Sequence, residues 1–256
     1  MRNKENKQKQ FKKEEAPKEE WKPKTELGRK VLSGEISSLN QALDYTAPIL
    51  EPQIIDALVP DLKSELLSVG QSKGKFGGGK RRAFRQTQRK TKEGNSISFS
   101  TLAAVGNGDG YLGIGFGKSR ETIPAREKAF RNAKLNIIKI RRGSGSWEGG
   151  DTNVPHSVPF IVTGKCGSVE LKLIPAPKGT GLCIEKECQK LLKLAGIKDV
   201  WSSTKGQTKI KFNLIQACMD ALKKASEYHL SPKDYQTLGV IEGSIEDKQK
   251  IHEMKI

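Results

Sequence analysis

The chain lacks long apolar segments and close cysteine pairs, and both absences limit what it can be. No apolar run approaches the about 18 residues that cross a bilayer. The first residues are mostly Lys, Glu and Gln, without the apolar centre of a signal peptide. The cysteines, Cys166, Cys183, Cys188 and Cys218, include no C-x-x-C pair of the kind that zinc ribbons and redox sites use. We therefore expect a cytoplasmic protein with no metal site and no cofactor.

Acidic residues are also in short supply relative to basic ones. The 46 Lys and Arg outnumber the 29 Asp and Glu, which gives a formal net charge of +17. An excess of this size repels itself in a compact fold, so a polyanion is the natural partner. Nucleic acid is the first candidate, and an anionic membrane surface, which requires an apolar span or a basic amphipathic helix, is the second.

Enzyme motifs occur only in incomplete form. The stretch from Gly113 to Ser119 ends in Gly-Lys-Ser like a phosphate-binding P-loop, but three residues instead of four separate Gly113 from Gly117. A G-x-G-x-x-G pattern begins at Gly108, but it leads from a turn into a strand, whereas dinucleotide sites lead from a strand into a helix. His156 lies between Pro155 and Ser157 in a loop with no catalytic partner nearby in sequence. We expect no enzyme.

Hydrophobic periodicity divides the chain into five segments. The expected fold class is α+β, because both central units mix hairpins with helices. The expected segments are an N-terminal extension at 1–70 with the first ~20 residues mobile, a first unit at 71–142, a Gly-rich connector at 143–157, a second unit at 158–226, and an irregular, charged tail at 227–256.

The first unit is predicted as three strands followed by a helix. Its strands are expected at 82–85, 97–105 and 111–117, and its helix is expected to begin at a Thr122 cap. The second unit is predicted with strands at 158–162 and 169–173, a helix at 185–195, short extended pieces at 197–201 and 208–212, and a last helix at 213–226. Gly196 is the expected stop of the first of these helices.

Positive charge gathers on the first unit. Residues 71–92 contain nine Lys or Arg and no acid, and they are interleaved with glycines that let backbone amides approach phosphates. The helix carries a basic stripe at i+3 spacing, and the glycine-rich strand allows close approach of RNA backbone or of a packed helix. The predicted RNA-binding residues are Lys80, Arg81, Arg82, Arg85, Arg89, Lys90, Lys92, Gly113, Gly115, Gly117, Lys118, Arg120, Lys128, Arg131, Lys134, Arg141 and Arg142.

Several ordered motifs resemble the small-subunit ribosomal protein uS5 family. One covers Val105–Lys118, a second covers Thr163–Leu182, and a third covers Leu194–Ser202. The stretches Trp21–Gly28, Ala133–Gly143 and Pro155–Pro159 are similar to archaeal and eukaryotic members, and the variant looks archaeal-like. Archaeal relatives often have cysteines near the Gly-Ser-Trp-Glu segment, where this chain has Ser144, Gly149 and Asp151, so no metal cluster is expected around His156.

The resemblance implies a fold and partners. The first unit is expected to be a double-stranded-RNA-binding-like domain, followed by a two-layer α/β domain. Implied partners are small-subunit ribosomal RNA, messenger RNA at the entry channel, and the neighbouring ribosomal protein uS4. By motif, Gln86–Asn95 matches a long RNA-contacting loop, Arg81, Arg82 and Arg85 match a region toward the messenger entry path, and Lys178, Gly179, Thr180 and Gly181 match a protein contact that influences decoding accuracy.

The positions of the aromatic residues bear on the mode of RNA binding. Tyr111 and Phe116 differ in parity along the glycine-rich strand, so they face opposite sides and form no shared stacking surface. We therefore expect recognition of RNA by charge and shape. The alternative from another class is a free-standing regulator that binds double-stranded RNA away from the ribosome.

Overall fold

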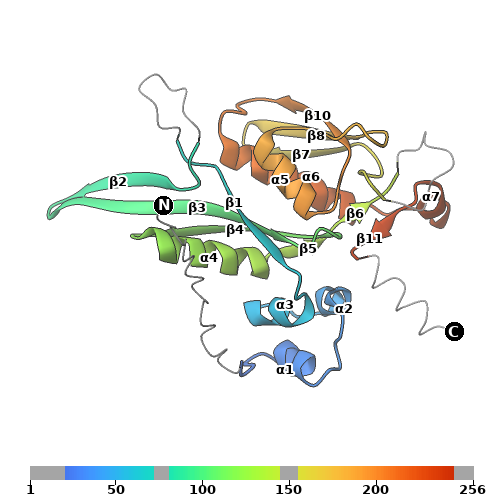
Figure 1. Ribbon diagram of the computed structural model, residues 1–256, viewed down its shortest axis with the longest axis horizontal. Helices are drawn as coiled ribbons and strands as arrows, with labels where there is room; N and C mark the ends of the chain where they lie inside the picture. The colour runs from blue at the N-terminus through green and yellow to red at the C-terminus, as the bar shows by residue number, and fades with distance from the viewer. Residues whose placement is uncertain (1–20, 72–80, 145–154, 245–256) are drawn as a thin grey trace, which may run out of the picture.

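A computed structural model describes residues 21–71, 81–144 and 155–244. Figure 1 shows a long twisted sheet between two sets of helices, with a second, smaller sheet above it. The first 20 residues, expected to be mobile, lie outside the described part. Within that part, no helix is long and apolar enough to cross a membrane.

The N-terminal extension forms three short helices, α1 (Glu26–Leu32), α2 (Leu39–Asp44) and α3 (Pro52–Leu58). The side chains of Thr25 and Ser38 cap the first two. All three contribute to a small core with Tyr111 of the first sheet, so the extension rests on the first unit. The sequence predicted such dependent helical pieces, including one near 53–59.

The first sheet contains β1 (Lys63–Leu67), β2 (Arg85–Thr91), β3 (Gly94–Gly106), β4 (Tyr111–Ser119) and β5 (Ile137–Lys139). Strand β3 is long enough to pair with β1 over one half and with β2 over the other, on the same edge. Two predictions were wrong here. Strand β1 lies in the segment assigned to the extension, and residues 86–95, expected to be a loop, form a hairpin of β2 with β3.

Helix α4 (Thr122–Leu135) covers one face of this sheet. Its buried residues are Ala125, Ala129 and Ala133, the small-residue face that the sequence predicted. The N-cap is Glu121 and not Thr122, and the Glu121 side chain makes no capping hydrogen bond within the described residues.

The second sheet has the order β7-β8-β10-β9. Its strands are β7 (Val162–Cys166), β8 (Val169–Pro175), β9 (Leu182–Cys183) and β10 (Val200–Lys205). The second unit also contains the helices α5 (Lys186–Leu194) and α6 (Lys211–Glu227). Gly196 ends α5 with a φ of +81°, as expected. The strand predicted at 158–162 instead begins at Val162, where Val162 and Gly164 are the buried alternate positions, and 208–212 leads into α6 instead of being extended.

The described part of the C-terminal segment has regular structure, contrary to the expected irregular tail, and residues 245–256 lie outside the described part. It contains α7 (Pro232–Thr237) and β11 (Ile241–Glu242), and β11 pairs with β6 (Arg141–Arg142). The ends of the predicted connector are held together by a bridge between Gly143 and Ser157, and residues 145–154 lie outside the described part.

One apolar core joins the two units. Leu102, Leu112 and Ile114 of the first sheet belong to the same buried cluster as Leu171 and Leu191 of the second unit. Helix α5 is the main bridge, since it contacts β1, β3 and β4 as well as α6. The mixed α+β class is confirmed, but the two units share a core.

Candidate RNA interface

The hairpin of β2 and β3 projects from the body as a two-stranded ribbon (Figure 1). Every residue of β2 is exposed, so none of the described residues covers either face of the ribbon along this strand. The pairing register, in which Arg85 opposes Ser100 and Arg89 opposes Ser96, assigns side chains to two faces because residues opposite each other share a face.

One face, here called the cationic face, carries positive and hydroxyl groups. The hydroxyls of Thr87 and Ser98 lie 2.8 Å apart on it. Its other members are Arg85, Arg89, Ser96 and Ser100, and Lys118 of β4 extends it because Lys118 opposes Ser100. Such a surface can neutralise phosphate charge, and the hydroxyls of its short side chains can donate hydrogen bonds to phosphate oxygens.

These cations are not used inside the fold. Among the residues that the structure describes, the recorded ion pairs involve none of Arg85, Arg89, Lys90, Lys92 and Lys118. Glu93 is the one acid between residues 81 and 100. The ribbon therefore projects uncompensated positive charge into solvent, which favours a polyanionic partner.

The basic stripe of α4 is exposed in part. Lys128 and Arg131 are exposed, as is Arg120 just before the helix. Lys134, the third member of the stripe, instead lies 2.7 Å from the Asp56 carboxylate of α3. It helps to hold the extension, so its expected RNA contact has a competing partner.

The three glycines of β4 face the protein, and their predicted contact with RNA was wrong. A Cβ on Gly113, Gly115 or Gly117 would lie 2.1 Å from a backbone atom of α4. The sequence left two uses open for this strand, RNA backbone or a packed helix, and the helix occupies it.

Arg141 and Arg142 are also removed from the RNA interface, because they are buried with only 9% and 3% of their surface exposed. The Arg141 Nε lies 2.6 Å from Glu242, and its guanidinium also donates to the carbonyls of Ala225 and Tyr228. The Arg142 guanidinium lies 2.6 Å from Asp109 and donates to the Gly243 carbonyl at 3.0 Å. Both arginines hold the C-terminal segment against the body.

The first basic residues of the run differ in their surroundings. Arg81 donates to the Lys209 carbonyl at 3.1 Å, which ties this segment to the second unit. Arg82 is exposed. Lys80 lies outside the described residues, so its predicted role stays a prediction.

The loop expected to contact a protein is held by hydrogen bonds at one end. Lys178 and Gly179 are exposed, with Gly179 at a φ of +85°. The Thr180 hydroxyl donates to the Pro177 carbonyl at 2.8 Å, and the Gly181 amide donates to Asp199 at 2.7 Å. The loop therefore presents a fixed backbone turn to solvent.

Asp199 also provides the hydrogen-bond partner of His156, a residue that the sequence analysis placed in a loop. The His156 Nδ1 lies 3.0 Å from the other Asp199 oxygen, and both residues are buried. His156 therefore lies inside the protein, where it helps to orient the carboxylate that holds the 178–181 loop.

Two of the cysteines are interior thiols. Cys188 of α5 and Cys218 of α6 are fully buried in the common core. Contact with Cys218, followed by burial, raises the pKa of the Cys188 thiol far above its ordinary value. It therefore stays protonated and acts as a small apolar side chain.

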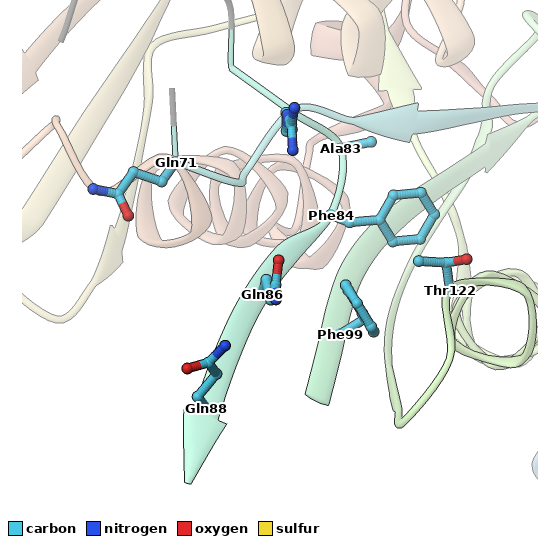
Figure 2. A pocket seen from close by; sticks show the side chains of 8 residues that line it. Gln71, Ala83, Phe84, Gln86, Gln88, Phe99 and Thr122 are labelled. Carbon is cyan, nitrogen blue, oxygen red and sulfur yellow. The ribbon is translucent and has the colours of Figure 1, made fainter. Parts of the chain in front are cut away.

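Sequence reasoning missed a groove at the base of the ribbon. Figure 2 shows Phe84 and Phe99 beside Thr122 at the start of α4, with Gln86 and Gln88 along β2. The groove has a volume of about 820 Å³, and Arg82 also lines it. The sequence signal for this groove was that Phe84, Gln86 and Gln88 are alternate residues, which share one face of a strand. The prediction missed it because residues 86–95 were expected to form a loop.

Comparisons with known proteins agree with this architecture. The family model for the N-terminal domain of ribosomal protein S5 matches residues 82–141, and the model for its C-terminal domain matches residues 164–232. The small ribosomal subunit protein uS5 of Nanoarchaeum equitans is 46% identical over 90% of this chain and 98% of its own length. Those of Methanothermobacter thermautotrophicus (46%, covering 87% and 95%) and Thermofilum pendens (47%, covering 82% and 96%) are similarly close.

These relatives confirm three predictions, namely the uS5 resemblance, its archaeal-like character, and the absence of an enzymatic role, since they are structural proteins of the small ribosomal subunit. They also confirm the expected location, the ribosomal small subunit in the cytoplasm. The chain belongs to the ribosomal protein S5 family.

Proposed function

We propose that the chain binds small-subunit ribosomal RNA through the cationic face of the β2–β3 ribbon and through the exposed cations of α4. The observation that carries this proposal is a projecting ribbon whose Arg and Lys side chains have no acidic partner among the described residues. Phosphate contacts of this kind release counterions and provide most of the affinity for RNA. Thr87, Ser96 and Ser98 add donors that fix the register of the backbone.

The same proposal extends to the first unit, the messenger RNA path and the 178–181 loop. The strand-strand-strand-helix unit acts as a double-stranded-RNA-binding-like domain, with Lys128 and Arg131 on its helix toward phosphates. Arg82 and the ribbon lie along the messenger RNA entry path. The loop from Lys178 to Gly181, whose exposed turn is held by Asp199, contacts ribosomal protein uS4 and supports decoding accuracy.

The salt dependence of RNA binding tests the cationic face. Replacing Arg85, Arg89 and Lys118 with Gln is expected to reduce the slope of log K against log salt by about 2 to 3, at 0.7–0.9 per phosphate contact. The measurement is binding of the full chain to purified small-subunit RNA between about 50 and 200 mM salt. The matched control replaces Lys193, Lys198 and Lys223 with Gln, three exposed cations of the second unit, and should leave the slope nearly unchanged. Equal slopes in the two variants would remove the ribbon from the interface.

Sedimentation separates the proposal from a free-standing RNA-binding regulator. A tagged full chain expressed in an archaeal host should co-migrate with small subunits in a sucrose gradient. A regulator would stay near the top of the gradient and would bind arbitrary duplexes equally well. Cross-linking of the recovered subunits through Lys178 then tests the contact with uS4.

A further inference from the structure

We infer that the second face of the ribbon binds unpaired RNA bases, in a groove where Phe84 and Phe99 provide stacking surfaces and Gln86 and Gln88 contact base edges. This inference rests on the proposed RNA-binding function and deepens it, because it assigns bases to one face of the ribbon and phosphates to the other. The face is here called the amide face. Its members are Phe84, Gln86, Gln88, Lys90, Asn95, Ile97 and Phe99.

The pairing register brings the two aromatic rings together. Phe99 opposes Gln86, and Phe84 stands two residues before Gln86, immediately ahead of the first paired residue, Arg85. The Thr101 hydroxyl donates to the Ala83 carbonyl at 3.1 Å, which holds the residues just before β2 against β3. Phe84 and Phe99 are therefore diagonal neighbours on one face, and both line the same groove (Figure 2).

These rings are apolar residues that the fold leaves partly uncovered. Thr101, Ala103 and Val105 lie on the same face of β3 and are fully buried, with α4 packed against that face. Helix α4 begins at Thr122, and no other helix among the described residues continues over the apolar face beyond this point. Phe84 and Phe99 are half-buried there, and Ile97 is 38% exposed.

The polar lining of the groove is suited to nucleobases. A Gln side chain offers both a donor and an acceptor, the combination that base edges also present. Gln86 and Gln88 are exposed, lie at alternate positions of β2 and line the groove together with Gln71. A volume of about 820 Å³ lies within the range of ligand-binding clefts and is ample for more than one base.

Charge identifies the partner as RNA instead of an apolar peptide. Arg82 lines the groove, Lys90 lies on the same face further out, and Arg85 and Arg89 are on the reverse of the same strand. Phosphates of a bound strand meet cations on either side of the ribbon. Aromatic rings accept bases only when those bases are unstacked, so the occupant is a single-stranded segment, a bulge or a loop, and not a continuous duplex.

The test compares two probes of equal charge on the purified full chain. One is a fluorescently labelled single-stranded uridine 12-mer, and the other is an abasic 12-mer with the same sugars and phosphates. Binding is followed by anisotropy at low salt. The wild-type chain is expected to bind the uridine probe at least about fivefold more tightly, since one base–aromatic stack of ~1 kcal/mol corresponds to that factor.

Variants assign the preference to the groove. Phe84→Leu with Phe99→Leu keeps apolar side chains in place but removes the aromatic faces, so the two probes should bind alike while affinity for the abasic probe is unchanged. Gln86→Ala with Gln88→Ala, at exposed positions that do not endanger folding, should also reduce the preference. The triple variant of Arg85, Arg89 and Lys118 should weaken both probes together and retain the preference.

Each alternative outcome overturns a different statement. A wild-type chain that binds both probes equally excludes base recognition but leaves phosphate binding intact. A chain that binds neither probe nor small-subunit RNA removes the proposed function itself. A uridine preference that survives in both groove variants places base contacts elsewhere. A dimer of the free chain that dissociates in the Phe84→Leu, Phe99→Leu variant assigns the groove to a second copy.

Discussion

At the residue scale, glycine in this protein brings helices close to sheets. Gly113, Gly115 and Gly117 repeat at every second position of β4, so all three point to the face covered by α4. Gly164 does the same in the second unit, where an added Cβ would lie 2.0 Å from the Ala217 carbonyl of α6. Small residues on both partners permit this approach, and any side chain larger than hydrogen would separate the layers.

Gly115→Ala is therefore expected to destabilise the fold by about 3 kcal/mol through overpacking. Its Cβ would meet both the Ala129 carbonyl and the Ala133 amide at 2.1 Å, so α4 as a whole must shift. Chemical denaturation monitored by circular dichroism measures the loss. The exposed-ribbon substitution Arg89→Ala serves as control and should change stability by less than about 0.5 kcal/mol. Equal stability of the two variants would mean that α4 is loosely packed.

At the element scale, short pieces are anchored by single polar residues. The three helices of the extension have six or seven residues each, too few to be stable by themselves in water. Glu51, the residue just before α3, connects α3 to the start of α1. Its carboxylate accepts hydrogen bonds from the Trp21 indole at 2.8 Å and from the Lys24 and Thr25 amides at 2.8 and 2.6 Å.

This arrangement makes the docking of the extension sensitive to acid. Desolvation by itself raises the pKa of Glu51, but the hydrogen bonds from Thr25, Trp21 and Lys24 outweigh it and hold the pKa below its ordinary value. A lowered pKa in the folded state means that the stabilisation is present above the unfolded-state pKa and is lost as pH falls through the folded-state pKa.

Glu51→Gln should therefore be less stable than the wild type at pH 7, and the difference should disappear in acid. Thermal melts of both chains from pH 7 to about pH 3 measure it. Glu26→Gln, at the first residue of α1, is the control for loss of a nearby carboxylate. A stability difference between Glu51→Gln and wild type that is the same at every pH would show that ionisation of Glu51 contributes nothing.

At the scale of the whole molecule, the two units behave as one body because they share a core. The Gly108 and Gly110 amides donate to the Leu194 and Ala195 carbonyls at the end of α5, at 2.8 and 3.1 Å. The Ser68 amide, just after β1, donates to the Glu187 carboxylate at 2.8 Å. Arg141 forms an ion pair with Glu242 of the C-terminal segment, and Arg142 forms one with Asp109 and donates to the Gly243 carbonyl. Together these contacts leave little independent freedom at the junction.

A single calorimetric unfolding transition is the expected consequence. Leu112→Ala, in the first sheet but within the shared core, should lower the stability of the whole chain by about 3 kcal/mol and shift that one transition. Lys92→Ala, at the exposed tip of the ribbon, is the control and should leave it in place. Two separate transitions, of which Leu112→Ala moves only the first unit's, would contradict a common core.

The sequence predicted best where the determining interactions are local. Helix α5 was placed at 185–195 and is observed at Lys186–Leu194, with the Gly196 stop in its left-handed conformation. The small face of α4 followed from the i+4 spacing of its alanines. Strand β1 was missed, because Lys-Ser-Glu-Leu-Leu has no alternation and becomes a strand only by pairing with residues about 40 positions further on.

The sequence by itself determined the family, the α+β class, the surplus of positive charge and the concentration of that charge around residues 81–92, since composition and short motifs carry this information. Only the tertiary structure decided which cations remain free. In the sequence, Arg141 and Arg142 look like Arg85 and Arg89. In the fold, Glu242 and Asp109 form ion pairs with Arg141 and Arg142, whereas Arg85 and Arg89 are exposed to solvent. The two faces of the ribbon likewise depended on a pairing register between separate strands, because that register alone determines which side chains lie together.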